Sequence, residues 1–248
     1  MATAYQRLDL ALVARGLAPS RAKAQAMISD GRVSLNGVTA TKANRKVSGN
    51  CDLSVETLDF EWVGRGALKL IAALDHFGCD CQNKVAVDIG ASTGGFSQVL
   101  LRRGAERVYA VDVGHGQLAP ELQNETRLIN LENLNARHLS ADHIPEPIDL
   151  VVSDVSFISL TKALPAALNL CRRGAVLAVL VKPQFEVGKG NLGKGGIVRD
   201  LELKEKVRRD MEAWIDARTG WRCLGSVESP ITGSDGNTEY LMGASFDA

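Results

Sequence analysis

The sequence has little of several features that mark particular classes of protein. Aromatic residues make up only 5% of the 248 residues, so broad aromatic surfaces for stacking are not expected. No pair of cysteines has the C-x-x-C spacing typical of zinc sites. The pattern therefore predicts no metal site and favours reduced thiols in a cytoplasmic protein. The five cysteines are Cys51, Cys79, Cys81, Cys171 and Cys223.

Long apolar runs are also absent. The longest candidate extends from Ala175 to Val181 and has the length of a buried strand, whereas a membrane-spanning helix needs about 18 apolar residues. Charged residues interrupt the first 16 positions before an apolar core of signal-peptide length can form. We therefore expect a soluble, cytoplasmic protein without a membrane partner.

The chain has no net charge, because 29 basic residues balance 29 acidic ones. The balance is uneven along the sequence. Residues 1–50 contain eight basic and two acidic side chains, a net charge of +6, so the remainder has −6. A cationic segment on a mildly anionic chain predicts a polyanionic partner for that segment.

Residues 1–59 are predicted to form a separate α+β module. Its pattern predicts a short helix ending at Gly16, a second helix from Arg21 to Asp30 with Ser20 as its N-cap, and two strands around an Asn36-Gly37 turn. The positions R-L-D, G-L, S-R-x-x-A-x-x-x-I and G-x-V-x-x-N-G resemble the alpha-L RNA-binding motif of ribosomal small-subunit protein four. A basic domain that only docks onto another protein is the alternative. The predicted RNA contacts of the module are Arg7, Arg21, Lys23 and Arg32.

From Lys84 onward, apolar strand-like runs alternate with helical segments, which predicts a mostly parallel α/β sheet with helices on both faces. A helix is expected from Leu160 to Leu170 and another from Leu201 to Arg218. Two closing strands without a helix between them predict an antiparallel edge. Residues 60–83 are predicted as a linker with a leading helix from Trp62 to His76, and residues 84–248 as the catalytic domain.

The segment VAVDIGASTGGF predicts a strand, a glycine-rich turn and a helix, an arrangement that binds nucleoside cofactors. Its spacing, G-x-x-x-G-G, differs from the dinucleotide and P-loop patterns. Acidic residues end two strands, and an acid about 20 residues after the turn commonly binds ribose hydroxyls. An enzyme that uses NAD remains the structural alternative. The predicted cofactor-binding residues are Asp88, Gly90, Ser92, Thr93, Gly94, Gly95, Phe96, Asp112 and Val113.

Two carboxylates and two lysines are the candidates for catalysis. Asp154 and Lys182 end two apolar strands, where α/β enzymes place their active sites. A lysine at the end of such a strand needs a partner, and Asp154 is the natural one. Lys69 lies in the leading helix, and Glu239 precedes the last strand. These groups can align an acceptor hydroxyl and remove its proton or stabilise the resulting alkoxide.

The whole chain closely resembles the TlyA (hemolysin A) family of ribosomal RNA methyltransferases. The resemblance depends on the motifs GRGALKL, DIGASTGGF, AVDVGHGQL, SDVSFISL, LVKPQFEVGKG and SPITGSDGNTEYL. It implies a Rossmann-like class I methyltransferase fold and the cofactor S-adenosylmethionine. It further implies a target on ribosomal RNA or ribosomal subunits, a cytidine 2'-hydroxyl, and no protein partner. It assigns a catalytic tetrad, which falls on Lys69, Asp154, Lys182 and Glu239.

Two positions depart from the family pattern. Gly64 replaces a serine in the linker motif, and Leu134 replaces a threonine in the segment LNAR. Three more basic residues are predicted to contact RNA: Arg65, Arg137 and, in the glycine-rich loop after Lys182, Lys189.

Two further functions remain as alternatives. A catalytically idle RNA-binding protein would keep the fold without the tetrad, which this chain retains. A pore-forming cytolysin is disfavoured, because the predicted helix from Leu201 carries acids, among them Glu202, Glu205, Asp210 and Glu212, between its basic residues.

Overall fold

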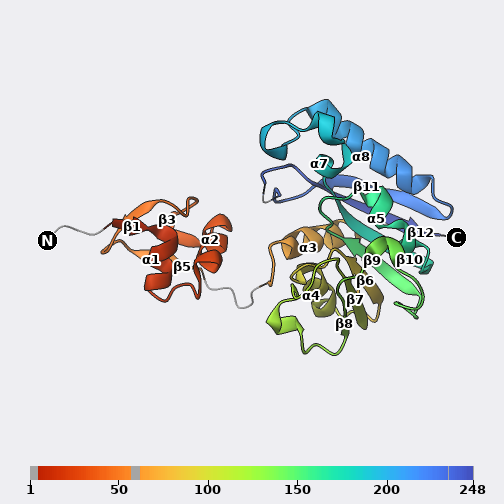
Figure 1. The fold of residues 1–248 in the computed structure, drawn as a ribbon, viewed down its shortest axis with the longest axis horizontal. Helices are drawn as coiled ribbons and strands as arrows, with labels where there is room; N and C mark the ends of the chain where they lie inside the picture. Colours follow the sequence, from red (N-terminus) through yellow and green to blue (C-terminus); the bar gives the residue numbers. More distant parts are fainter. Residues whose placement is uncertain (1–4, 57–61, 234, 248) are drawn as a thin grey trace. The chain divides into compact units, whose positions relative to one another are not determined.

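The computed structural model describes residues 5–56, 62–233 and 235–247. The chain forms two compact units, Met1–Glu61 and Trp62–Ala248. Each unit has its own hydrophobic core, and each is described by itself (Figure 1).

The first unit is a small α+β fold. Two antiparallel sheets, β1-β4 and β3-β2-β5, surround a core that includes Leu8, Leu12 and Ile28. The elements are β1 (Tyr5–Arg7), α1 (Leu8–Ala14), α2 (Arg21–Ser29), β2 (Val33–Leu35), β3 (Val38–Thr39), β4 (Lys46–Ser48) and β5 (Leu53–Val55).

The predicted helix cap and the predicted tight turn of this unit are both confirmed. The hydroxyl of Ser20 accepts a hydrogen bond from the backbone N–H of Lys23 and caps helix α2. Asn36 and Gly37 both have positive φ, 52° and 77°, as a tight turn between β2 and β3 requires.

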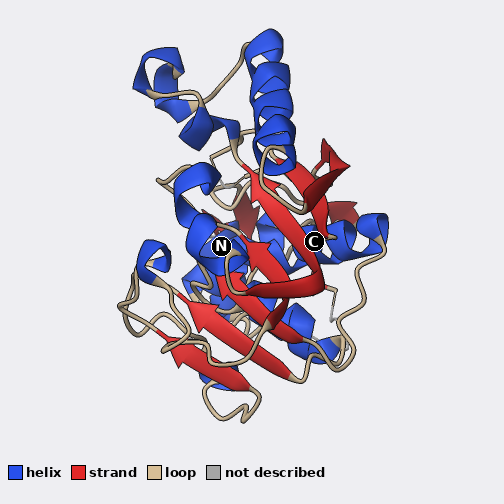
Figure 2. Ribbon diagram, turned by 90° about the vertical axis from the view of Figure 1, so that its right-hand side faces the viewer, coloured by secondary structure: helices blue, strands red, loops and turns tan. Residues whose placement is uncertain are grey.

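The second unit contains one seven-stranded sheet with the order β11-β12-β10-β9-β6-β7-β8. Strands β10, β9, β6, β7 and β8 are parallel to one another, and β12 is antiparallel to both β10 and β11. The mostly parallel sheet with an antiparallel edge region is confirmed (Figure 2). The strands are β6 (Val85–Ile89), β7 (Arg107–Val111), β8 (Leu128–Leu131), β9 (Ile148–Ser153), β10 (Cys171–Val181), β11 (Trp221–Glu228) and β12 (Tyr240–Phe246).

Helices cover both faces of the sheet, because successive strand residues point to opposite sides. In β9, Val151 belongs to one apolar core, while Leu150 and Val152 belong to the other. Helices α3 and α4 pack on the second of these cores, and α5, α6 and α8 on the first. The α-helices are α3 (Gly66–Phe77), α4 (Gly95–Arg102), α5 (Leu160–Ala163), α6 (Pro165–Leu168), α7 (Pro183–Glu186) and α8 (Leu201–Asp216). Short 3-10 helices are η1 (Pro120–Leu122), η2 (Ala136–His138), η3 (Lys189–Asn191) and η4 (Lys194–Gly196).

The structure corrects two predicted elements. The helix expected from Leu160 to Leu170 is divided into α5 and α6, because Pro165 has no N–H to continue the hydrogen-bond ladder. The leading helix begins at Gly66 and not at Trp62, since the three positions before it form bends and a turn. Within the described ranges, no helix is both long and apolar enough to cross a bilayer.

Candidate active site

Four of the predicted site residues directly follow parallel strands. Gly90 follows β6, Asp112 follows β7, Asp154 follows β9 and Lys182 follows β10. Because parallel strands end at the same edge of a sheet, these four positions lie together. Three hollows lie at this edge.

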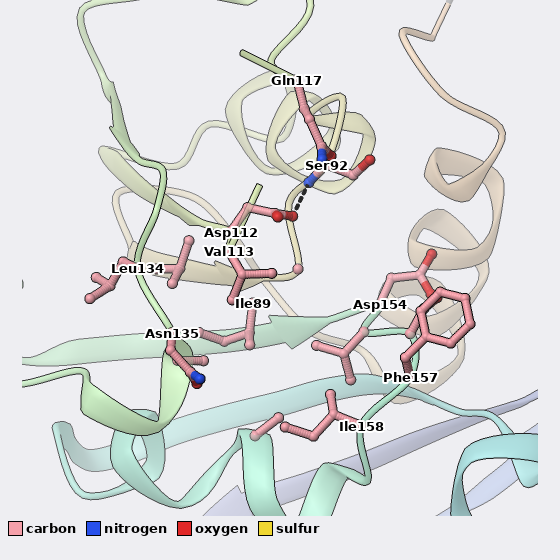
Figure 3. A pocket seen from close by; sticks show the side chains of 16 residues that line it. Ile89, Ser92, Asp112, Val113, Gln117, Leu134, Asn135, Asp154, Phe157 and Ile158 are labelled. Carbon is pink, nitrogen blue, oxygen red and sulfur yellow. Dashed lines mark hydrogen bonds between the residues drawn. The ribbon is translucent and has the colours of Figure 1, made fainter. Parts of the chain in front are cut away.

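The first hollow has a volume of about 360 Å³. Its walls are largely apolar and include Ile89, Val113 and Leu134, and its polar groups include Asp112 and Asn135. Figure 3 shows Asp112 hydrogen-bonded to Ser92, with Asp154 and Phe157 at the opposite end of the same hollow. A mainly apolar space with one carboxylate is suited to a nucleoside.

Two carboxylates hold the loops of this hollow. Asp112 accepts hydrogen bonds from the backbone N–H groups of Ser92 (2.8 Å) and Gly114 (2.7 Å). Glu132 accepts from Gly116 (2.7 Å) and Gln117 (3.2 Å). The hydrogen bond from Gly116 is the largest effect that lowers the pKa of Glu132. Both loops are therefore tied to strand ends before any ligand arrives.

The second hollow is smaller, about 260 Å³, and lies between the glycine-rich turn and the start of α3. It shares Gly90, Ser92 and Asp154 with the first hollow, so the two form one elongated space. A Cβ on Gly66 would come within 3.3 Å of the Oδ2 atom of Asp154. Glycine at this position therefore keeps the backbone close to the carboxylate.

Gly64, a departure from the family pattern, also borders the second hollow. A Cβ there would lie 2.9 Å from the hydroxyl oxygen of Thr93, closer than real Cβ contacts. A serine at position 64 would therefore require Thr93 to move.

The third hollow is the largest, about 1130 Å³. Its lining includes the cationic side chains of Arg137, Lys162 and Lys182. Phe157 lies at its junction with the first hollow and is 92% exposed, with a φ of 67° that is unusual for a bulky residue. An exposed aromatic ring held by a strained backbone is a mark of a ligand-binding position.

The four tetrad candidates form two ion pairs. The Nζ of Lys182 lies 2.6 Å from the Oδ1 of Asp154, and the Nζ of Lys69 lies 2.5 Å from the Oε2 of Glu239. Lys182 and Glu239 line the third hollow together, so the two pairs meet at one space. Each carboxylate lies close enough to balance the charge of its lysine.

Asp88 is placed differently from the other predicted cofactor residues. It is fully buried and lines none of the three hollows, and its Oδ2 accepts hydrogen bonds from the backbone N–H and the hydroxyl of Ser97. Among the described residues, none donates a hydrogen bond to its Oδ1. Burial, the largest effect, raises the pKa of this carboxyl to about 7.

The remaining predicted cofactor residues divide into two groups. Gly90, Ser92, Thr93, Gly95, Phe96 and Val113 line the first or the second hollow. Gly94 lines none of the three, and a Cβ there would collide with Leu118 and Leu122. Its positive φ of 89° and this close packing account for glycine at the position.

The predicted RNA contacts are dispersed. Arg7 and Arg21 donate hydrogen bonds to the buried Asp9, although their side chains remain 39% and 54% exposed. Arg32 donates to the carbonyl of Glu56, and Lys23 lies in the first turn of α2. Arg65 lines the second hollow and Arg137 the third. The side chain of Lys189 lies outside the described part of the chain.

Sequence reasoning missed several lining residues. Ser156, Phe157 and Gln184 all border the third hollow. They follow the predicted strands by only two or three positions, so their place after Asp154 and Lys182 was the available signal.

Comparisons with known proteins agree with this geometry. The model of the FtsJ-like methyltransferase family matches residues 62–246, and that of the S4 domain matches residues 6–51. The 16S/23S rRNA (cytidine-2'-O)-methyltransferase TlyA of Mycobacterium tuberculosis is 46% identical over 243 residues, which cover 95% of this chain and 88% of the relative. Hemolysin A of Brachyspira hyodysenteriae is 40% identical, covering 95% of this chain and 98% of the relative.

Solved structures show the same fold. A candidate hemolysin from Streptococcus thermophilus has a TM-score of 0.74 at 36% identity, covering 99% of this chain and 90% of that one. A protein from Listeria monocytogenes, described as a candidate S-adenosylmethionine-dependent methyltransferase, has a TM-score of 0.55 at 11% identity. It covers 74% of this chain and 100% of that one, and shows the fold alone.

Proposed function

Because the chain belongs to the TlyA family of FtsJ-like methyltransferases, we propose that it transfers a methyl group from S-adenosylmethionine to a ribose 2'-hydroxyl of ribosomal RNA. One observation carries the proposal. The Lys182–Asp154 ion pair lies where the space formed by the first two hollows meets the large third hollow. A methyl donor on one side and an acceptor on the other would meet at this pair.

The residues of the first two hollows fit the cofactor. The apolar walls around Val113 and Leu134 suit adenine, and the carboxylate of Asp112 suits ribose hydroxyls. Arg65 lines the second hollow, which favours a contact with the methionine carboxylate over the predicted RNA contact. When bound, S-adenosylmethionine would supply a methyl group that is activated by the positively charged sulfur. The negative charge of Asp154 would favour binding of this positively charged group.

Asp88 supports the cofactor site indirectly. Its hydrogen bonds to Ser97 hold the first turn of α4 against the end of β6. The glycine-rich turn is the loop between these two elements, so Asp88 fixes both of its ends. We propose this supporting role in place of direct contact with the cofactor.

Lys182 is the residue that acts on the acceptor hydroxyl. Its ammonium, held by Asp154, stabilises the negative charge that develops on the 2'-oxygen as its proton is released to water. The oxygen would then bond to the methyl carbon that the bound cofactor supplies, and the electron pair of the carbon–sulfur bond would pass to sulfur. The alignment of these three atoms supplies much of the rate gain. Glu239 and Lys69 hold the opposite wall and balance its charge.

The third hollow and the first unit are proposed to hold RNA. Arg137 and Lys162 are positioned to contact phosphates, and Phe157 offers its ring to a base. The first unit adds cationic surface for binding that does not depend on RNA sequence. In this proposal residues 1–59 bind RNA, residues 60–83 connect them to the catalytic domain, and residues 84–248 catalyse methyl transfer. The protein would act on ribosomal RNA or ribosomal subunits in the cytoplasm.

The proposed target nucleotide is cytidine, because the relative from Mycobacterium tuberculosis is named for that nucleotide in 16S and 23S rRNA. The test is to incubate ribosomal RNA and purified subunits with the protein and S-adenosylmethionine, and to map 2'-O-methylated sites. Reactions without cofactor are the control. We expect new methylation at a cytidine, and no cofactor-dependent methylation on any substrate would overturn the proposal. RNA binding without methylation would identify the idle RNA-binding protein, and binding of NAD in place of S-adenosylmethionine would identify the dehydrogenase-like alternative.

A further inference from the structure

Ser156 has a position that no other described lining residue has. It borders all three hollows, including both parts of the proposed cofactor space and the proposed RNA space. It lies two residues after Asp154, in the loop that follows β9, and its side chain is exposed. The three spaces therefore meet at this residue.

The hydroxyl also contacts the proposed catalytic lysine. The Nζ of Lys182 donates a hydrogen bond of 3.1 Å to the Oγ of Ser156. An ammonium has only hydrogens to give, so Oγ is the acceptor in this bond. The hydroxyl hydrogen of Ser156 then remains to be donated to another acceptor.

We propose that Ser156 is a further catalytic residue that donates its hydroxyl hydrogen to the 2'-oxygen of the target ribose. This inference rests on the proposed function. Methyl transfer requires the acceptor oxygen to lie where the cofactor space and the RNA space join, and Ser156 and Lys182 are the two donors beside that junction. Together they form a two-donor site for the developing alkoxide, as an oxyanion hole does.

No covalent bond to the serine is made or broken in this scheme. The 2'-oxygen would bond to the methyl carbon as the carbon–sulfur bond breaks and its electron pair passes to sulfur. The ribose proton would pass to water, and the serine would keep its own proton throughout. Its contribution is electrostatic, because an O–H donated to the 2'-oxygen stabilises the negative charge that develops there. Loss of one such donor lowers kcat by about 100-fold or more.

The first experiment compares Ser156→Ala, Ser156→Thr and the control Ser245→Ala in the full-length protein. Ser245 lies in β12 and contacts Asp247, away from the three hollows. We expect Ser156→Ala to lower kcat by about 100-fold with unchanged affinity for S-adenosylmethionine and an unchanged Tm, while Ser156→Thr retains most activity. Equal losses in the alanine and threonine variants, or no loss in either, would overturn the inference.

The second experiment separates direct contact from an effect through Lys182. It measures binding of an RNA fragment that carries either ribose or deoxyribose at the target nucleotide, and needs no turnover. In a Lys182→Ala background, preference for the ribose form should persist and then disappear when Ser156→Ala is added. If Lys182→Ala alone removes the preference, Ser156 does not contact the ribose.

The two proposals fail in different ways. Methylation by the wild-type protein with a fully active Ser156→Ala variant would remove only the role of the serine. Absence of methylation by the wild-type protein would remove the proposed function itself.

Discussion

The carboxylate of Glu239 lies 2.5 Å from the ammonium nitrogen of Lys69, although 170 residues separate them in the chain. Both side chains are almost fully buried, with 3% and 9% of their surfaces exposed. Lys69 extends from helix α3, and Glu239 lies at the entry to β12. The pair therefore joins the leading helix to the antiparallel strand at the wall of the third hollow.

Removing one partner of this pair should destabilise the protein. Glu239→Gln leaves the buried charge of Lys69 unpaired, and we expect the free energy of unfolding to fall by about 3 kcal/mol in urea titrations. Adding Lys69→Met should restore most of the loss. The matched control is Asp210→Asn, which breaks a pair of the same 2.5 Å length between exposed side chains, and should cost less than about 1 kcal/mol. An equal loss of unfolding free energy in Glu239→Gln and Asp210→Asn would contradict this account.

Lys182→Met should abolish catalysis while the cofactor still binds. Methionine keeps an unbranched apolar side chain, one atom shorter, but removes the charge proposed to stabilise the alkoxide, so we expect kcat to fall by about 1000-fold. Isothermal titration should give an unchanged affinity for S-adenosylmethionine. Lys206→Met on the exposed face of α8 is the control for loss of a lysine. Activity of Lys182→Met equal to that of the control would refute the assigned role.

The raised pKa of Asp88 predicts that the stability of the protein depends on pH. Its folded pKa of about 7 lies above the unfolded value of about 3.9, so the neutral form contributes stability that is lost as pH rises from about 4 to about 7. Asp88→Asn has no such titration. Relative to the wild type, its free energy of unfolding should rise by on the order of 2 kcal/mol between pH 5 and pH 8. A difference that stays constant over this range would show that Asp88 titrates normally.

The lowered pKa of Asp9 predicts that the stability of the first unit depends on pH in the opposite direction. The hydrogen bond from Arg7, with others from Gln25 and Arg21, holds the pKa of Asp9 well below its usual range. Its ionised form therefore contributes stability above about pH 4, and this contribution is lost as pH falls below that value. Asp9→Asn should destabilise the unit by on the order of 2 kcal/mol at pH 7, and by less at pH 3.

NMR signals of the Val33 and Val47 methyl groups during urea unfolding would measure the stability of this unit alone. Asp52→Asn, at an exposed carboxylate of the same unit, is the control. A deficit of Asp9→Asn that is equally large at pH 3 would rule out titration of Asp9 as the cause.

Local chemistry allowed much of the fold to be predicted. The cap at Ser20, the turn at Asn36 and Gly37, and the alternating strands and helices are set by neighbours in sequence. The strand-end rule also predicted the proximity of Asp154 and Lys182, since β9 and β10 are adjacent and parallel. The break at Pro165 was missed although the residue responsible is visible, because the apolar pattern continues through it.

Other parts of the site were beyond such rules. The sequence placed Asp88 among the cofactor contacts, yet the packing of α4 over β6 encloses it completely. Similarly, the sequence predicted that Arg7 and Arg21 contact RNA, while in the fold both form ion pairs with the buried Asp9. Burial and long-range pairing set these contacts, and neither follows from spacing along the chain.

By itself, the sequence determined which segments become strands and helices, which turns need glycine, and which residue types stand at the strand ends, because each of these depends on interactions between near neighbours. Only the tertiary structure decided that Glu239 pairs with Lys69, that Ser156 borders three hollows and that Asp88 is enclosed. These relationships depend on the order of strands in the sheet and on the packing of helices over it, which bring together groups far apart in the chain.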